Sequence, residues 1–202
     1  NIIFLNNILL FIKLKKYLFI IKRMKSDQIL SGLNDAGFIY LYAFLYALLE
    51  IEMEGKEGWA KNLPTPVFLG EFTLYHVLMN IIVVITILKV YFHQLADTAN
   101  SIFFIAAWFL IEDFMWFVYN PHFTLKKYTK KDIWWHARQP WLLGIPIHNW
   151  IGLIVMGLSY YFSEHKQFLL SSFMWMSILS IIGIIIAPLY HKFYKNTHKN
   201  VK

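Results

Sequence analysis

The chain has 202 residues and a formal net charge of +7, and its composition is 58% hydrophobic, 19% aromatic and only 15% charged. A soluble globular domain carries roughly 25% charged residues, so this composition favours an integral membrane protein. Cysteine is absent, which excludes disulfides, zinc–thiolate sites and thiol nucleophiles. The basic residues lie between long apolar runs, and no nucleic-acid-binding motif is present. We therefore assign them to a membrane surface and expect no nucleic-acid partner.

Residues 1–23 form an apolar leader that carries three lysines in its middle, Lys13, Lys15 and Lys16. The first methionine is Met24, and the composition of the leader is typical of translated AT-rich DNA. We therefore expect the native chain to start at Met24 and residues 24–202 to form a single transmembrane helical bundle domain. The alternative is a basic amphipathic anchor helix. A secretory signal is excluded, because no small-residue cleavage site follows the apolar run.

Five apolar stretches follow, and the longer ones match a hydrocarbon core of about 30 Å at 1.5 Å per helical residue. They are residues 37–49, 72–92, 101–119, 141–162 and 168–190. Backbone polar groups must be satisfied inside each segment in lipid, which favours helices. The sequence thus predicts an all-α fold, a polytopic transmembrane bundle of about five crossing helices. Pro121 is expected to end the third helix, because the residue before a proline disfavours the α region.

Loop charges predict the orientation of this bundle. With five crossings, one side receives eleven basic residues: Lys56, Lys61, Lys126, Lys127, Lys130, Lys131, Arg138, Lys192, Lys195, Lys199 and Lys202. The other side receives three: Lys25, Lys89 and Lys166. Cytoplasmic loops carry an excess of lysine and arginine, so we expect a cytoplasmic C-terminus. The expected partners are then membrane lipids and an apolar small-molecule substrate.

The same threading brings acids and histidines to the cytoplasmic leaflet. The first helix ends with Glu50, Glu52 and Glu54, and His76 lies in the first turns of the second helix. Glu112 interrupts the third helix beside Asp113, and each carboxylate costs about 2.5–3.5 kcal/mol to insert at a helix centre. Ionisable residues inside a membrane are functional-site hypotheses by default. Two turn-rich loops, residues 54–70 and 120–136, are expected to cover this cluster as a lid.

Carboxylate oxygens and imidazole nitrogens suit a divalent metal ion, namely zinc, iron or manganese. The predicted ligands are Glu50, Glu54, His76, Glu112 and His136, and the predicted general base is Asp113 or His122. The motif evidence is weak, because no HExxH, GxSxG or phosphate-binding glycine loop is present. Structural interpretations remain open for these residues: His76 as an interhelical hydrogen-bonding group, Glu112 as a packing residue, and His148 as an interfacial histidine.

Three functional hypotheses follow from this convergence. The first is a small membrane enzyme, a metal-dependent hydrolase or oxidoreductase, that acts on a lipid or other apolar substrate at the cytoplasmic leaflet. The second is a proton- or ion-coupled transporter or channel subunit in which Glu112 and Asp113 carry the ion. The third is an assembly subunit whose acid pair binds a partner helix. The one-sided distribution of the polar residues favours the enzyme over transport.

Overall fold

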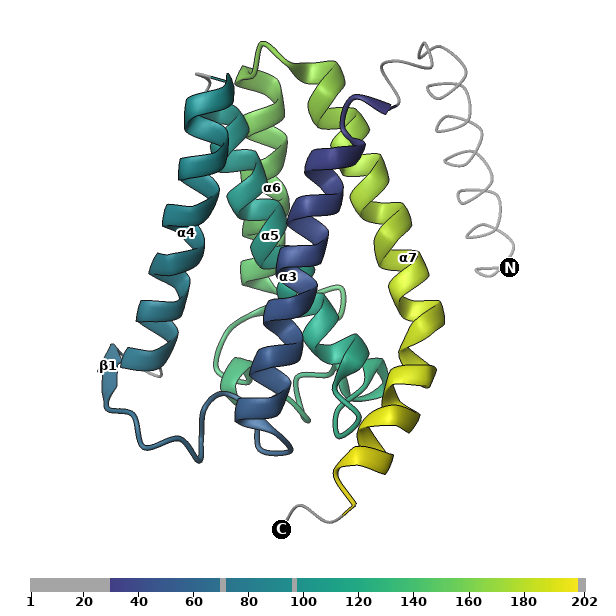
Figure 1. Ribbon diagram of the computed structural model, residues 1–202. Helices are drawn as coiled ribbons and strands as arrows, with labels where there is room; N and C mark the ends of the chain where they lie inside the picture. Colours follow the sequence, from purple (N-terminus) through teal and green to yellow (C-terminus); the bar gives the residue numbers. More distant parts are fainter. Residues whose placement is uncertain (1–29, 70–71, 96–97, 200–202) are drawn as a thin grey trace, which may run out of the picture.

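The described part of the chain, residues 30–69, 72–95 and 98–199 of the computed structural model, is built almost entirely from helices (Figure 1). Its five α-helices are α3 (Leu33–Glu54), α4 (Leu74–Leu95), α5 (Thr98–Tyr119), α6 (Ile147–Phe162) and α7 (Lys166–Thr197). Two short 3-10 turns, η1 (Leu125–Lys127) and η2 (Trp134–His136), lie between α5 and α6. The predicted all-α class is confirmed. The leader, residues 1–23, lies outside the described residues.

Four of these helices, α3, α4, α5 and α7, are long and apolar enough to cross a membrane. The number differs from the predicted five because α6 has only 16 residues. At 1.5 Å per residue its length is about 24 Å, which is short for a hydrocarbon core of about 30 Å. The helix α7 is instead longer than the predicted stretch of residues 168–190, because it begins at Lys166 and continues to Thr197.

The shortening of α6 has a local cause in the hairpin that precedes it. The strands β3 (Trp141–Leu142) and β4 (Ile145–Pro146) pair in antiparallel fashion, with Leu142 opposite Ile145. Both loop residues, Leu143 and Gly144, have positive φ angles of 53° and 78°. Two successive positive φ angles are typical of the tight turns that match the twist of paired strands. The first six residues of the predicted fourth crossing therefore form a hairpin, and the helix begins after Pro146.

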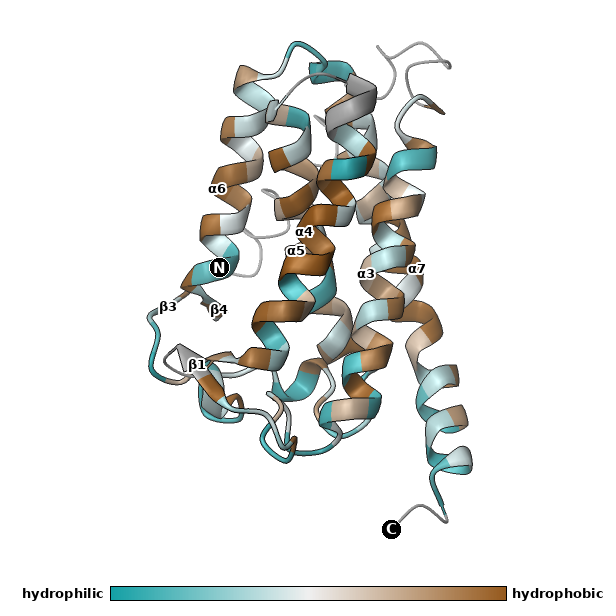
Figure 2. Ribbon diagram, turned by 60° about the vertical axis from the view of Figure 1, so that its left-hand side comes forward, coloured by the Kyte–Doolittle hydropathy of each residue, from teal (hydrophilic) through white to brown (hydrophobic). Residues whose placement is uncertain are grey.

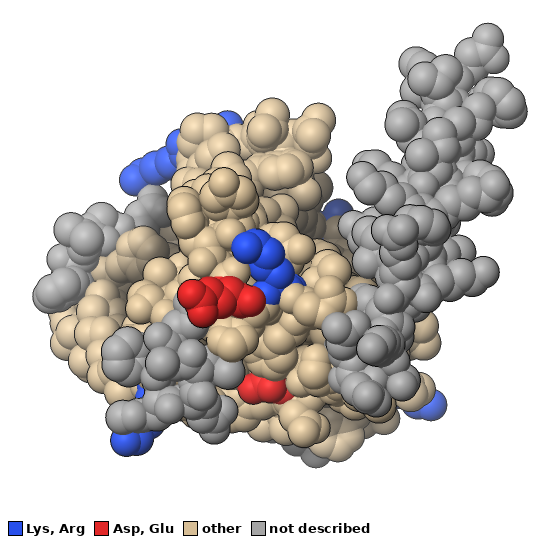
Figure 3. Space-filling view, turned by 90° about the horizontal axis from the view of Figure 1, so that it is seen from above, with Lys and Arg blue, Asp and Glu red and all other residues tan. Residues whose placement is uncertain are grey.

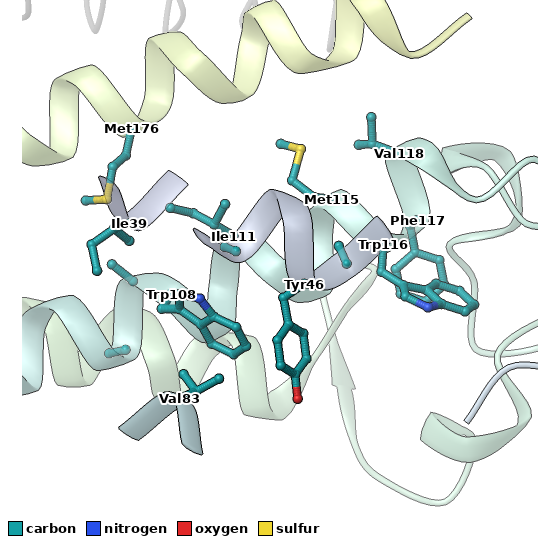
Figure 4. Close-up of a cluster of buried hydrophobic side chains, with 14 of the residues drawn as sticks. Ile39, Tyr46, Val83, Trp108, Ile111, Met115, Trp116, Phe117, Val118 and Met176 are labelled. Carbon is teal, nitrogen blue, oxygen red and sulfur yellow. The ribbon is translucent and has the colours of Figure 1, made fainter. Parts of the chain in front are cut away.

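The central element of the bundle is α5, which contacts α3, α4, α6 and α7. Its hydrophobic residues are distributed all around the helix, which is typical of a helix enclosed by others. Figure 4 shows part of this core, where Tyr46 of α3 lies beside Trp108 of α5. Their ring centroids are 4.9 Å apart and the rings are nearly perpendicular, the edge-to-face arrangement that aromatic pairs prefer.

Successive helices run in opposite directions, so the ends of α3 and α5 and the starts of α4 and α6 meet at one end of the bundle (Figure 1). The C-terminal end of α7 lies at this end too. Figure 2 shows hydrophobic residues along the middle of the helices and hydrophilic residues in the loops at this end. Figure 3 looks at the opposite end, where few charged side chains are seen among the described residues. The polar segments that were predicted to meet thus lie at one end of the helical bundle.

Two loops close the polar end, as the turn-forming residues predicted. The first follows α3 and leads through Gly55 and Gly58, both with positive φ, to the short strand β1 (Val67–Leu69), which pairs with β2 (Phe72–Thr73). A Cβ atom on Gly58 would lie 2.8 Å from the ring of Trp135, so both the backbone conformation and the close approach require glycine there. The second loop follows α5, which ends at Tyr119, as Pro121 predicted.

Candidate metal centre

The neighbouring acids Glu112 and Asp113 face different partners because consecutive residues of an α-helix point about 100° apart. Glu112 faces α3, where its carboxyl group hydrogen-bonds that of Glu50. Asp113 faces α6 and the loop after α5, where two imidazoles approach its carboxylate. One turn of the central helix therefore contributes to two separate polar clusters.

The first cluster consists of Asp113, His136 and His148, whose potential ligand atoms all lie within 4.8 Å of one another. Nε2 of His136 is 3.8 Å from Oδ1 of Asp113, and Nε2 of His148 is 3.7 Å from Oδ2. The two imidazole centroids are 4.5 Å apart. His136 is held by η2 and is only 7% exposed, and His148 is the second residue of α6. Three distant segments thus bring one carboxylate and two imidazoles together.

A shell of hydrogen bonds orients these three side chains. The amide nitrogen of Gln139 lies 2.7 Å from Nδ1 of His136, and its oxygen lies 2.8 Å from Nδ1 of His148. Asn149 donates from Nδ2 to Oδ2 of Asp113 at 3.0 Å and to the hydroxyl oxygen of Tyr128 at 2.6 Å. Burial raises the pKa of Tyr128, and the nearby Asp113 carboxylate raises it further, so this hydroxyl stays protonated at neutral pH.

The donor set fits a divalent metal ion. Two imidazoles and one carboxylate are the ligands of many catalytic zinc and non-haem iron sites. Ligand atoms about 2.0–2.2 Å from such an ion lie roughly 3–3.5 Å apart, slightly closer than the 3.7 and 3.8 Å seen here. The buried Nε2 of His136 lies 3.8 Å from Oδ1 of Asp113 and has no partner within hydrogen-bond distance in the described structure. The three side chains would move closer together to hold such an ion and would leave a further coordination position open.

The second cluster contains Glu50 and Glu112 at the interface of α3 and α5. The two carboxyl groups interact directly across this interface. The second oxygen of Glu112, Oε1, is buried and has no partner within the described structure. The pair therefore has one acceptor position that is open to a ligand or to a water molecule.

Glu54 and His76 form a buried pair close to this cluster, with Oε1 of Glu54 3.3 Å from Nε2 of His76. The two carboxylate oxygens of Glu54 also accept backbone N–H groups, Oε2 from Trp59 at 2.9 Å and Oε1 from Ala60 at 3.0 Å. The carboxylate thus closes the turn that follows α3. His76 stacks on the Trp59 ring at 4.2 Å, and its Nδ1 contacts Thr73. The contacts of this pair are structural, because they hold the turn that follows α3 in place.

Both clusters border one cavity of about 960 Å³, at the upper end of the range of about 300–1,000 Å³ for small-molecule sites. The cavity is lined by five residues of the predicted site: Glu50, His76, Glu112, Asp113 and His136. His148, Gln139 and Arg138 line it as well, and Trp59 and Trp135 cover its polar end. The predicted convergence of acids and histidines in one place is therefore observed.

The five predicted ligands do not form one coordination sphere. Among the described residues, three side chains have potential ligand atoms within 4.8 Å of one another, and these are Asp113, His136 and His148. Trp59 separates His76 from His136, because its ring stacks on the first and contacts the edge of the second at 6.0 Å. Glu54 does not line the cavity. Metal binding by Glu50, Glu54, His76 and Glu112 stays a prediction that this geometry does not favour.

His122, the alternative predicted base, lies apart from both clusters. Its ring contacts Tyr194 of α7 at 5.9 Å, its backbone N–H donates to Asn120, and it does not line the cavity. Partial burial lowers the pKa of its imidazole, and the neighbouring Lys127 lowers it further. The catalytic role stays a prediction, and the described contacts give His122 no path to the cavity.

Sequence reasoning missed two residues of the first cluster. The sequence alone favours an interfacial role for His148 and predicts no role for Gln139. The signal available for His148 was its position at the start of the fourth helix, on the same side as His136 and beside Asn149. Gln139 carries no comparable signal, because its role depends on how the loop folds back on itself. No protein family, curated protein or solved structure matches the chain.

Proposed function

We propose that this protein is an integral membrane enzyme that holds a divalent metal ion between Asp113, His136 and His148 and acts on a lipid or other apolar substrate. The observation that carries the proposal is the meeting of this donor set with a cavity whose remaining walls are largely apolar. Small-molecule sites typically combine mostly apolar walls with a few convergent polar groups. Zinc, iron and manganese all suit two nitrogens and one carboxylate oxygen.

The proposed chemistry divides between the metal and the side chains around it. A bound divalent ion would act as a Lewis acid that polarises an oxygen of the substrate or lowers the pKa of a bound water molecule. Asn149 holds the Asp113 carboxylate in position through its 3.0 Å hydrogen bond. Glu50 and Glu112 line the same cavity, and their carboxyl groups are the candidates for proton exchange with a substrate group. This combination supports a hydrolase or an oxidoreductase.

The proposed membrane arrangement is the predicted one, with α6 as a short fifth crossing and the polar end in the cytoplasm. Four helices of sufficient length support an integral membrane protein, and the alternating helix directions support the side assignment. Ten of the eleven basic residues assigned to the polar end lie in described loops, in the last turns of α7 or directly after it: Lys56, Lys61, Lys126, Lys127, Lys130, Lys131, Arg138, Lys192, Lys195 and Lys199. The excess of lysine and arginine then places the site at the inner leaflet.

Metal analysis of the purified protein tests the proposal. We expect one divalent ion per chain in the wild type, and a loss on the order of tenfold or more in metal affinity for His148→Ala and Asp113→Asn, because each variant removes one of three ligands. The matched control is His165→Ala, which removes an exposed histidine at the opposite end of the bundle. Metal-free wild type that also fails to bind added zinc, iron or manganese would refute the proposed centre.

A second candidate function, proton transport, is favoured by the buried Glu50–Glu112 carboxyl pair. A transport path also needs polar groups toward the opposite face, and the cavity beyond Asp113 is lined by apolar residues of α5 and α6. The enzyme therefore remains the preferred proposal. A pH-dependent flux through liposomes that is lost in Glu112→Gln but retained in Asp113→Asn would support transport instead.

A further inference from the structure

The cavity extends well beyond the polar clusters. Its wall on α5 runs from Asp113 back to Ile102, and the helical rise of 1.5 Å per residue makes this distance about 16 Å. One leaflet of a hydrocarbon core of about 30 Å has nearly the same thickness. Asp113 is the sixteenth residue of α5 and Ile102 is the fifth, so the cavity runs from the polar half of the bundle to within about 6 Å of the start of α5.

The walls of this extension are apolar and partly open to the outside. On α5 they are Ile102, Ile105, Ala106, Phe109 and Leu110, and on α6 they are Ile151, Gly152 and Val155. Ile102 and Ile151 are 42% and 54% exposed, so this part of the cavity opens on the outer surface of the bundle. In a membrane that surface faces lipid chains. An alkyl chain can thus enter sideways, without its polar end having to cross the hydrocarbon core first.

The polar end, by contrast, is lined by aromatic rings. The stacked rings of Trp59 and Trp135, 6.4 Å apart, cover it, and His136 beneath them is only 7% exposed. A small polar group needs less space beside these rings than a glycerophospholipid head group with its second chain. The extension itself lies beside the contact between α5 and α6, which pack directly against each other at Leu110 and Gly152.

From these observations we propose that the cavity binds a single-chain amphiphile with a small head group, such as a long-chain acid, alcohol or aldehyde. The alkyl chain lies along α5 between Phe109 and Val155 and ends near Ile102. The polar group lies beside Asp113, His136 and His148. Only the chemical fate of that polar group rests on the proposed function, because the binding of the chain needs neither a metal nor a reaction.

Binding of saturated fatty acids of increasing chain length to the delipidated full chain in detergent, with a chelator present, tests this inference. We expect affinity to rise with chain length until the chain fills the 16 Å extension and then to level off. Val155→Trp fills the middle of the extension, and we expect it to weaken the binding of long chains on the order of tenfold. Ile102→Trp fills only the far end of the extension, so we expect it to weaken the binding of the longest chains and to leave the binding of shorter chains unchanged.

The matched control is Ile154→Trp, the same kind of substitution at the residue of α6 that precedes Val155. Ile154 is 59% exposed and does not line the cavity, so its replacement should leave binding unchanged. Equal binding by all four proteins, or equal competition by a two-chain phospholipid, would overturn the inference. The outcome is separable from that of the metal analysis: chain binding without metal removes only the proposed centre, and metal binding without chain selectivity removes only the proposed substrate.

Discussion

The side-chain oxygen of Gln139 lies 2.8 Å from Nδ1 of His148, while its amide nitrogen lies 2.7 Å from Nδ1 of His136. An amide has one accepting end and one donating end, so it cannot accept a proton from both imidazoles at once. One histidine therefore carries a proton on Nδ1 and donates it to the amide oxygen. The other accepts at Nδ1 and carries its proton on Nε2. If the oxygen and nitrogen of the Gln139 amide changed places, the two histidines would exchange their donor and acceptor roles.

This arrangement limits metal affinity, because a metal-ligating imidazole donates its other N–H to an acceptor. We expect Gln139→Glu to raise the affinity of the cluster for zinc by roughly tenfold, the lower end of the effect of such supporting groups. A carboxylate can accept from both Nδ1–H groups and adds a negative charge beside the ion. Competition against a chromogenic chelator measures the change.

The control for this prediction is Gln167→Glu, which adds the same charge near the start of α7 at the opposite end of the bundle. It should leave zinc affinity unchanged. A weaker zinc affinity in Gln139→Glu than in the wild type would contradict the role assigned to the amide.

The Glu54 carboxylate provides a prediction about stability. Its two oxygens accept the N–H groups of Trp59 and Ala60, and the side chain is buried. In Glu54→Gln one oxygen becomes an NH₂ group that faces a backbone donor, so a buried N–H loses its acceptor. We expect a loss of about 1–3 kcal/mol in the free energy of unfolding, measured by tryptophan fluorescence in detergent.

Glu57→Gln is the matched control for this prediction, because it makes the same chemical change three residues later. The side chain of Glu57 is 33% exposed and pairs with the exposed Lys61. Such surface pairs contribute little, so the free energy of unfolding should change by less than about 0.5 kcal/mol. Equal effects of the two substitutions would show that Glu54 does not close the turn.

His198 provides a prediction about pH. A hydrogen bond from its Nε2 to the Glu52 carboxylate at 2.8 Å raises the pKa of this exposed imidazole above its ordinary value of about 6.5. A raised native pKa means that the contact stabilises the fold fully below the ordinary pKa. The contribution is lost as pH rises through the raised pKa. We therefore expect the melting temperature of the wild type to exceed that of His198→Gln at about pH 5.5, and the two to converge at about pH 8.5.

Glu52→Gln should remove the same pH-dependent difference, because the imidazole then has no charged partner. The double variant should behave like either single variant in this pH range, since the two side chains act as one pair. A difference between wild type and His198→Gln that grows toward alkaline pH would have the wrong sign for this contact.

The candidate site divides into what the sequence indicates and what it does not. The carboxyl pair inside the third apolar segment and His136 in the following loop were identified because charged groups are costly in lipid and because helix directions must alternate. The assignment of Glu50, Glu54 and His76 to the same ion was not supported, because Trp59 lies between His76 and His136. His148 was missed, because its proximity to Asp113 results from a hairpin that shortens α6.

The amino-acid sequence by itself predicted the helical class and the end of the bundle at which acids and histidines gather, and its composition favours a membrane environment. These follow from composition and from the order of apolar segments, which depend on each residue separately or on its near neighbours. Only the tertiary structure decided which of those side chains touch. The contacts of Gln139, Trp59 and His148 depend on loop conformations and on the rotation of each helix about its axis, and these are set by many weak contacts between residues distant in the chain.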